Sequence, residues 1–298
     1  MAAALALKVP LERPSLKTMQ NPKHLDLLIN LGAALVGLIV VGYVVYAAFH
    51  TEVEQPCSTR FPAATRFSLQ TGAGKPLTPV ELQARAGLRD LGVIDNATVV
   101  RVEDGPSPEA LAVKLRNLPA GDDPDAKLRN GIEFRWSPPG IAGANSACLS
   151  YSLWLPEKFE FGGGGVLPGV FGGEPAAPRQ RAVNDRLAVT LEWSAEGQPS
   201  LVAAVDGGEH SRMSGTNFSL PTNRWTKIEQ EIVLSDPNQP NGVVRLWVDG
   251  ELFAEDDNVP LRKDDKVLLT GVLIAIGYKR APPSGGMLRL SPIEIGWR

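Results

Sequence analysis

The feature that most constrains this chain is an uncharged apolar run near the N-terminus of its 298 residues, Leu27–Phe49. As a helix, its 23 residues would cover about 35 Å at about 1.5 Å per residue, which is enough to cross the hydrocarbon core of a bilayer. The alternative is a cleaved signal peptide, whose apolar core typically has about 7–15 residues and ends at a small-x-small cleavage site. We therefore interpret the run as a retained transmembrane helix.

The charges on either side of this run predict its orientation. Four basic residues precede it, whereas two acidic residues follow it before the first basic residue, Arg60; the flanking residues are Lys8, Arg13, Lys17 and Lys23, then Glu52 and Glu54. Basic residues favour the cytoplasmic side of a membrane. The sequence predicts a single-pass protein in the bilayer, with a cytoplasmic N-terminus and a periplasmic or otherwise extracytoplasmic C-terminal domain.

The remaining composition limits the classes of partner. The apolar content of 43% is sufficient for one sizeable core. The net charge is −3, and residues 27–298 carry 26 basic against 31 acidic side chains. Because nucleic acids are bound by basic surfaces, a nucleic-acid partner is not expected. A local basic cleft on a mildly acidic protein could still bind an anionic polysaccharide.

The two cysteines, Cys57 and Cys148, lie on the predicted outer side, where disulfides persist in oxidising compartments. A bridge would join the segment after the membrane helix to an apolar strand. Two unpaired thiols are the alternative, and the sequence leaves both open. The histidines are scattered, so we expect no metal site and no cofactor: His24, His50 and His210.

The chain is predicted to have four parts: a cytoplasmic tail (1–26), the transmembrane helix (27–49), a linker with a short helix (50–96) and a β domain (97–298). The short helix is expected over Leu77–Leu91, with Thr78 as its cap and Pro79 in its first turn. Its candidate apolar face comprises Val80, Leu82, Leu88 and Leu91.

From Ala97 onward, short β-forming runs alternate with turn-forming clusters. The expected strands are Ala97–Val102, Ala110–Leu115, Gly131–Trp136, Cys148–Leu155, Leu187–Trp193, Trp225–Leu234, Val243–Val248, Val267–Gly277 and Met287–Ile295. The dipeptide Asp249-Gly250 is typical of a tight hairpin turn. Many antiparallel strands at this spacing predict an all-β fold, a two-sheet jelly-roll sandwich of the concanavalin-like type.

The centre of the β region carries a family resemblance. Residues 149–161 read LSYSLWLPEKFEF, and residues 162–173 read GGGGVLPGVFGG. This pattern resembles polysaccharide lyase family 14, the alginate and glucuronan lyases, in which a strand ending in Phe-Pro-x-x-Phe precedes Gly-Gly-Lys-Leu-Pro-Gly-Leu-Tyr-Gly-Gly. Segments 112–121, 223–228 and 244–250 are also similar, so the resemblance covers roughly residues 97–295 and implies the jelly-roll fold.

The resemblance also implies a chemistry whose residues are missing here. Such lyases cleave uronic acid polymers by β-elimination, in which a cation or donor neutralises the carboxylate, a base removes the C5 proton and an acid assists the leaving oxygen. The family's lysine falls on Val166, and its serine and arginine fall on Ala188 and Thr190. The strand that usually supplies tyrosines is Leu201–Val205. The resemblance therefore implies a catalytically degenerate domain.

Other residues are candidates to have taken over the site. Tyr278, Lys279 and Arg280 end a strand, where ligands are commonly bound. His210 and Arg212 are expected on a loop. Cations that could contact a uronate carboxylate are Arg179, Arg181 and Arg186, although for each of these polar residues a solvated surface position is the alternative. Trp154 and Trp193 could stack on sugar rings, or they could pack in the core.

Three hypotheses of function follow. The first is a membrane-anchored, lyase-like domain that binds a glycan or a protein partner without cleaving it. The second is an active lyase with a rearranged site, and the third is an accessory subunit of a membrane complex. A site lined with Arg, Lys, Tyr or His favours the second, and one lined with Val, Ala and Thr favours the first. The glycine run Gly162–Gly165 lacks the Lys-Ser/Thr of a phosphate loop, and it predicts a flexible rim loop.

Overall fold

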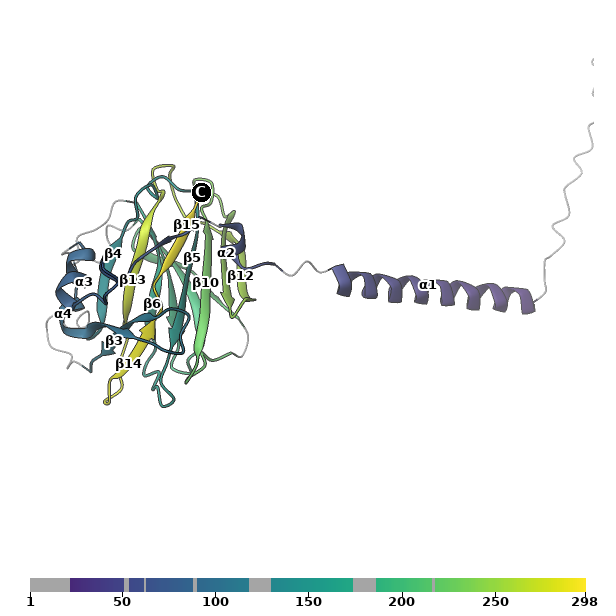
Figure 1. Ribbon diagram of the computed structural model, residues 1–298. Helices are drawn as coiled ribbons and strands as arrows, with labels where there is room; N and C mark the ends of the chain where they lie inside the picture. The colour runs from purple at the N-terminus through teal and green to yellow at the C-terminus, as the bar shows by residue number, and fades with distance from the viewer. Residues whose placement is uncertain are drawn as a thin grey trace, which may run out of the picture. The chain divides into compact units, whose positions relative to one another are not determined.

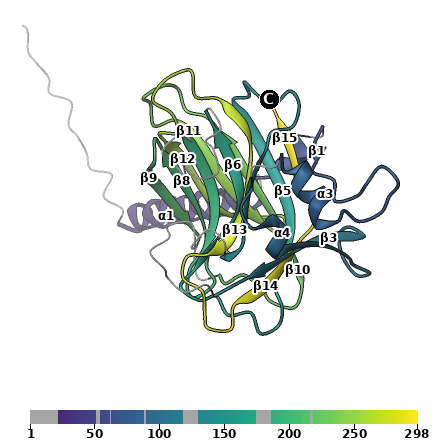
Figure 2. The ribbon, with the colours of Figure 1, turned by 90° about the vertical axis from the view of Figure 1, so that its left-hand side faces the viewer.

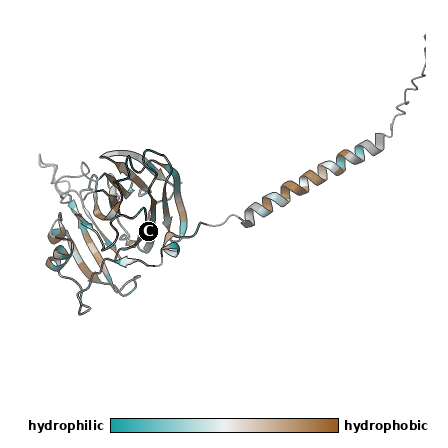
Figure 3. Ribbon diagram, turned by 90° about the horizontal axis from the view of Figure 1, so that it is seen from above, coloured by the Kyte–Doolittle hydropathy of each residue, from teal (hydrophilic) through white to brown (hydrophobic). Residues whose placement is uncertain are grey.

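The structure is a computed structural model that describes residues 22–50, 54–61, 63–87, 90–117, 130–173, 186–215 and 218–298. The chain divides into two compact units, Met1–Val53 and Glu54–Arg298. The first contains the helix α1 (Pro22–His50), whose stretch Ile29–Tyr46 is long and apolar enough to cross a membrane. Figure 3 shows the hydrophobic residues along this helix.

The second unit, called the β unit below, is a sandwich of two antiparallel sheets (Figures 1 and 2). The nine-stranded sheet contains β1 (Thr65–Arg66), β2 (Ala97–Arg101), β3 (Glu109–Leu115), β5 (Ser146–Trp154), β10 (Trp225–Val233), β11 (Gly242–Val248), β12 (Glu251–Val259), β14 (Gly286–Leu290) and β15 (Glu294–Trp297). The six-stranded sheet has the order β4 (Ile132–Trp136), β13 (Leu269–Tyr278), β6 (Gly165–Gly172), β7 (Leu187–Trp193), β8 (Pro199–Val205) and β9 (Gly208–Ser214). The predicted all-β sandwich is confirmed.

The strand with the weakest local β-forming sequence, β6, is stabilised by pairing with the strands on both sides. β6 contains three glycines and Pro168, which are poor strand formers. It nevertheless pairs with β13 on one side and β7 on the other. The predicted strand Met287–Ile295 is two strands, because β14 ends at Leu290 and β15 begins at Glu294, on either side of Pro292. Proline cannot donate to a sheet ladder.

The core lies between the two sheets, and alternate residues of strands such as β7 point into it. Leu149 and Leu153 of β5 face Leu187 and Leu191 of β7 within one apolar cluster. Complete burial of such side chains contributes about 1.5–3 kcal/mol each. The irregular pairing of β6 between Leu167 and Gly169 leaves the Pro168 carbonyl without a ladder partner, and it accepts a hydrogen bond of 2.8 Å from the buried amide of Gln230.

A group of aromatic rings packs at the end of the sandwich that lies beside the central motif. Phe159 stacks on Tyr278 at 5.9 Å and meets the edge of Trp193 at 6.2 Å. A Cβ atom on Gly165 would lie 2.0 Å from the Trp193 ring, so this position requires glycine. The spacing of aromatic residues and glycines in residues 159–165 therefore serves packing.

The segment 54–96, predicted as a linker, packs on the sandwich and contributes α2 (Cys57–Arg60), α3 (Pro79–Arg85) and α4 (Val93–Asn96). The predicted cap of α3 is confirmed, since the Thr78 hydroxyl accepts from the Glu81 amide. The helix ends at Arg85, before Gly87 adopts a φ of +82°. Leu82 is buried as predicted, whereas Val80 is exposed, which contradicts its place on the apolar face.

The predicted hairpin turn is also confirmed. Asp249 and Gly250 both have positive φ, at +52° and +86°, between β11 and β12. Two consecutive positive φ angles fit a two-residue turn whose twist matches that of the flanking strands. The Asp249 side chain accepts a hydrogen bond from the Lys227 amide of β10, which ties the turn to the next strand.

Candidate functional site

Strand alternation sorts the residues of β7 and β8 between the core and the opposite surface of the six-stranded sheet. Leu187, Val189 and Leu191 point into the core. Ala188 and Thr190 therefore point away from it. They lie directly opposite Ala204 and Val202 of β8. The positions that the resemblance marks as catalytic on these strands thus share one surface.

The same surface continues over β6 and β13. Val166 packs against a small cluster formed by Phe171, Leu273 and Ala275, which is separate from the main core. We call this surface of the six-stranded sheet the outer face; its members are Val166, Phe171, Ala188, Thr190, Val202, Ala204, Leu273 and Ala275. Apart from the Thr190 hydroxyl, these side chains carry no group that can donate, accept or hold charge.

One end of the outer face carries charged groups around Glu192. This residue lies opposite Val166 in the β6–β7 pair, and its side chain is 13% exposed. Its carboxylate accepts from Arg212 Nη1 at 2.6 Å and pairs with Lys279 Nζ. Arg212 also donates to the Ser200 hydroxyl at 3.2 Å. Glu192 is therefore held by two cations that come from β9 and from the end of β13.

The β4 edge of the outer face carries Glu133 and Arg135, and Arg135 lies in the same row across the sheet as Thr190. The closest charged atoms of Glu133 and Arg135 are 3.7 Å apart, and both side chains are nearly buried. The Arg135 guanidinium lies over the Phe171 ring, 5.8 Å from its centre. Charged groups thus lie at the Glu192 end and along the β4 edge of the outer face, and the positions between them are apolar or hydroxyl-bearing.

Tyr278 does not lie on the outer face with Lys279, because consecutive residues at the strand end point to opposite sides. Its side chain is 4% exposed, and its hydroxyl donates to the Glu160 carbonyl at 2.6 Å. Burial, and then the nearby Glu160 carboxylate, raise the pKa of the Tyr278 phenol well above its ordinary value. Tyr278 is therefore a protonated core residue at neutral pH and not a candidate base.

The two tryptophans differ in their placement. Trp193 is buried in the core, and its indole N–H donates to the Phe161 carbonyl at 3.0 Å, so it cannot stack on a ligand. Trp154 lies on the opposite sheet, on the surface that faces away from the core, and it is only partly buried. The two residues that were predicted to contact sugars thus lie in different environments.

The cations that were predicted to contact a carboxylate also separate. Arg179 and Arg181 lie outside the described residues. Arg186 pairs with both Asp206 and Asp264, and so it already has two carboxylate partners. Arg280 is exposed just after β13, with its side chain beside Gly163.

His210 lies in strand β9, so its predicted place on a loop is wrong, and the same holds for Arg212. The His210 side chain is outside the described part of the chain. The sequence signal for a strand is the buried Met213 between the polar, exposed residues Arg212 and Ser214. Sequence reasoning also missed Glu192, although it stands in the alternating run Leu187–Trp193 between two inward residues.

The glycine run is a packed turn and not the predicted flexible loop. The Gly163 amide donates to the Arg280 carbonyl at 2.8 Å, and the Gly164 carbonyl accepts from the Lys279 amide at 2.9 Å. Gly165 lies against the Trp193 ring. This turn fixes the backbone of Lys279 beside β6, where its side chain reaches Glu192.

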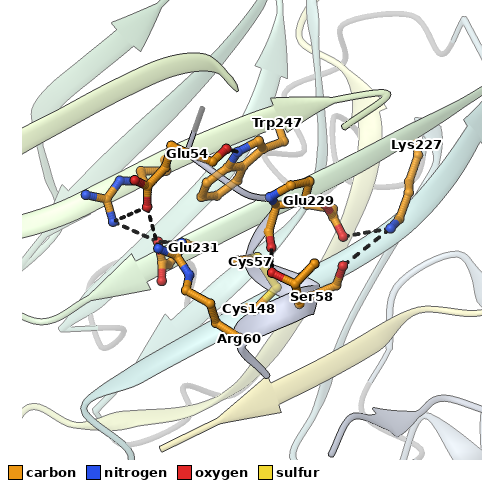
Figure 4. The surroundings of a disulfide bond; sticks show 12 residues. Glu54, Cys57, Ser58, Arg60, Cys148, Lys227, Glu229, Glu231 and Trp247 are labelled. Atoms are coloured by element: carbon orange, nitrogen blue, oxygen red, sulfur yellow. Dashed lines mark hydrogen bonds and ion pairs between the residues drawn. A yellow bond between two sulfur atoms is a disulfide. The ribbon is translucent and has the colours of Figure 1, made fainter. Parts of the chain in front are cut away.

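A disulfide joins Cys57 of α2 to Cys148 of β5 on the outward surface of the nine-stranded sheet (Figure 4). Trp247 is fully buried beside it and donates to the Glu54 carbonyl at 3.1 Å. Arg60 pairs with Glu231 at 2.6 Å beneath the same segment. The bridge, the ring and the ion pair together hold residues 54–60 on the sheet.

The described residues contain no group of three His, Cys, Asp or Glu side chains that could hold a metal ion. The outer face can contact an anionic ligand through Lys279 and Arg212. Its centre offers no group to remove a proton.

Comparison with known proteins gives the same fold. The family model named Polysaccharide lyase 14 matches residues 107–278. The marine PL-14 alginate lyase from Aplysia kurodai superposes with a TM-score of 0.58 at 18% identity, covering 73% of this chain and 94% of that one. Alginate lyase vAL-1 from Chlorella virus gives 0.58 at 16% identity, covering 78% and 100%. No curated protein matches the sequence.

Proposed function

Because the chain belongs to the polysaccharide lyase 14 family, we propose that its β unit is a lyase-like domain that binds a uronate polymer at the outer face without cleaving it. The observation that supports this is the composition of the positions between the charged groups at the Glu192 end and those along the β4 edge. Val166, Ala188, Thr190, Val202 and Ala204 lie on one surface, and none can act as a general base at neutral pH.

The missing groups affect each part of a β-elimination. A carboxylate neutraliser lowers the free energy of the developing enolate, and a base and an acid move protons. One acid or base group contributes typically about 10²–10⁴ in rate. Glu192 is the carboxylate nearest to Val166 in register, but Lys279 and Arg212 already hold it. The described outer face therefore lacks a free base.

Binding makes weaker demands than cleavage. Lys279 is about half exposed, and its side chain reaches from the end of β13 to Glu192 of β7, where its ammonium group can also contact a ligand carboxylate. The Thr190 hydroxyl can donate to a sugar oxygen. An apolar floor with cations beside it, at the Glu192 end and on β4, fits a chain of rings that carry acidic substituents, and this is the ligand class we assign to the outer face.

We also propose that α1 anchors the protein in a membrane, with residues 1–26 in the cytoplasm and the β unit outside. The support is the apolar length of Ile29–Tyr46 and the basic residues that precede it. A disulfide between Cys57 and Cys148 fits an oxidising compartment on the outer side.

A second candidate is an active lyase with a rearranged site. One observation favours it: Lys279 places a cation beside Glu192, directly opposite the position of the family's lysine at Val166. In this mechanism Lys279 or Arg212 neutralises the substrate carboxylate, and Glu192, released from its ion pairs, accepts the C5 proton. The Tyr278 hydroxyl takes no part, because it points into the core.

The accessory-subunit hypothesis predicts an apolar patch on the exterior of the sandwich. In the described part of the β unit, the exposed large apolar side chains are Val80, Ile94 and Met287. Met287 lies on β14, whereas Val80 and Ile94 lie on α3 and α4. This distribution gives the hypothesis no support.

The test uses the full chain in detergent micelles with a panel of uronate polymers, including alginate and glucuronan. We expect no rise in ultraviolet absorbance from unsaturated product, together with saturable binding by calorimetry. Lys279→Gln should weaken that binding, and Lys75→Gln, which removes an exposed lysine from a distant turn, is the matched control. Product formation that Glu192→Gln abolishes would establish the rearranged lyase instead.

A further inference from the structure

Three side chains form a row across the nine-stranded sheet, on the surface opposite the outer face. Arg289 of β14 lies directly opposite Trp154 of β5, and Trp154 lies directly opposite Trp225 of β10. Residues that are directly opposite in antiparallel strands project to the same side, with Cβ atoms about 4.5–5.5 Å apart. The arginine and the two indoles are therefore neighbours on one surface.

This surface faces away from the core. Leu153 and Ile228, which alternate with the row on β5 and β10, belong to the core cluster. Trp154 and Trp225 belong to no buried cluster, and each is only partly buried. Trp193 and Trp247, in contrast, are buried and donate their indole N–H groups to carbonyl oxygens. The row thus contains two partly exposed indoles in direct register.

Arg289 has no anionic partner in the described part of the chain. Its guanidinium lies 4.7 Å from the centre of the Trp154 ring, and its buried Nε has no hydrogen-bond partner among the described residues. Arg60, Arg186 and Arg245, in comparison, each pair with carboxylates. An arginine that is desolvated on one side and unpaired favours an incoming carboxylate.

The charges near the row indicate where an acidic ligand group would bind. Lys114 of β3, which lies opposite Met287, is a second exposed cation on the Arg289 side. Gly105, in the loop that joins β2 to β3, lies against the Trp225 ring. An acidic group is therefore favoured beside Arg289 and Lys114.

We propose that Arg289, Trp154 and Trp225 form a second binding site for a uronate-containing oligosaccharide. The carboxylate of one sugar accepts hydrogen bonds from Arg289, and the rings of this sugar and its neighbour stack on the two indoles. The choice of a uronate rests on the proposed function, whereas the need for a flat ring and an acidic group rests on the row itself.

A protein partner fits the row less well than a sugar does. Stable protein interfaces bury about 800 Å² on each side around an apolar centre. Beyond the two indoles, the exposed neighbours on this surface are Lys114 and Met287, and Ser152 and Lys227 lie in the adjacent row. A small aromatic area with a cation at one end fits a rigid ring ligand.

The test measures binding of an alginate oligosaccharide to the full chain in detergent micelles, with a neutral gluco-oligosaccharide of equal length and a short acidic peptide as comparison ligands. We expect Trp154→Ala and Trp225→Ala each to weaken alginate binding about tenfold, which corresponds to about 1.4 kcal/mol. Arg289→Gln should remove the preference for alginate over the neutral sugar. Arg101→Gln, an exposed cation on β2 of the same sheet, is the control.

The outcomes separate the two sites. Weaker binding in the row variants supports this site whether or not Lys279→Gln also weakens binding, and an unaffected Lys279→Gln would in addition place no ligand on the outer face. Loss in Lys279→Gln alone overturns this site and leaves the proposed function standing. No alginate binding by the wild-type chain, or tighter binding of the acidic peptide, also overturns it. If Trp154→Ala fails to fold, as judged by circular dichroism, Trp225→Ala and Arg289→Gln decide the result.

Discussion

Val166 and Glu192 lie directly opposite each other across β6 and β7, with both side chains on the outer face. The position of the family's lysine is thus an aliphatic residue that faces a carboxylate. That carboxylate is neutralised from elsewhere, by Lys279 and Arg212. The charge balance of this end of the sheet is kept without a cation at position 166.

Val166→Lys is expected to fold and to remain inactive. An opposite-charge pair across two antiparallel strands contributes about 0.2–1 kcal/mol, so the introduced lysine opposite Glu192 should not destabilise the sheet. The base and acid are still missing, and catalytic residues act as a unit. The measurement is the absorbance of unsaturated uronate product from alginate and glucuronan. Turnover by this single variant would show that the other groups are present.

Removing the disulfide should lower the free energy of unfolding substantially. The bridge joins residues separated by 91 positions, and closing a loop of about 100 residues is worth up to about 4.7 kcal/mol in the chain-entropy estimate. We expect the double variant Cys57→Ala/Cys148→Ala to unfold at a lower denaturant concentration than wild type. Wild-type protein treated with reductant should approach the double variant. Two free thiols titrated in untreated wild-type protein would contradict the bridge.

The ion pairs of Arg186 should make stability depend on acid pH. Arg186 lowers the pKa of Asp264, and Lys263 followed by Arg186 lowers the pKa of Asp206. A depressed carboxyl pKa stabilises the folded state above the ordinary value of 3.8, and this contribution is lost as pH falls through the folded pKa. Arg186→Gln should therefore be less stable than wild type at neutral pH. The difference should shrink below about pH 3, and a constant difference would argue against this cause.

Tyr278→Phe is expected to reduce stability and leave ligand binding unchanged. The variant removes the hydrogen bond that the Tyr278 hydroxyl donates to the Glu160 carbonyl, at a cost of about 0.5–1.5 kcal/mol. The ring still stacks on Phe159. Chemical denaturation measures the first effect and calorimetry with alginate measures the second. A change in affinity at unchanged stability would return Tyr278 to the binding site.

The proposed orientation predicts which end of the chain an external protease reaches. In sealed cells or spheroplasts, added protease should digest the β unit and spare a tag placed on residues 1–26. The basic residues before the apolar run are the physical reason. The matched sample, permeabilised with detergent, should lose both ends. Digestion of the N-terminal tag in sealed cells would reverse the orientation.

The predictable parts of the fold are those set by neighbouring residues. The alternation in β5 and β7, the cap at Thr78 and the turn at Asp249-Gly250 are local patterns, and the structure has all of them. Only the family resemblance covered the segment that forms β6, because its glycines and Pro168 are poor strand formers. Its place in the sheet depends on pairing with β13 and β7. The candidate site shows the same division.

The site could be predicted only where alternation assigns a face. Val272, Ile274 and Ile276 point to the same side of β13 as Tyr278. The burial of Tyr278 therefore follows from the alternation of apolar residues along this strand. The contact of Lys279 with Glu192 could not be predicted from alternation. It joins residues 87 positions apart and depends on the order of β13, β6 and β7 in the sheet. The row of Arg289, Trp154 and Trp225 likewise depends on register across β14, β5 and β10.

The bridge between Cys57 and Cys148 also decides how the protein responds to being cut. If the chain is nicked anywhere between residues 58 and 147, the C-terminal piece stays covalently attached to Cys57, and through it to α1. If α1 anchors the protein in a membrane as proposed, a single cut outside the membrane frees the whole sandwich only when it falls between His50 and Cys57. Shedding of an intact β unit is thereby confined to one short segment, and a nicked chain in an oxidising compartment still behaves as one molecule until it is reduced.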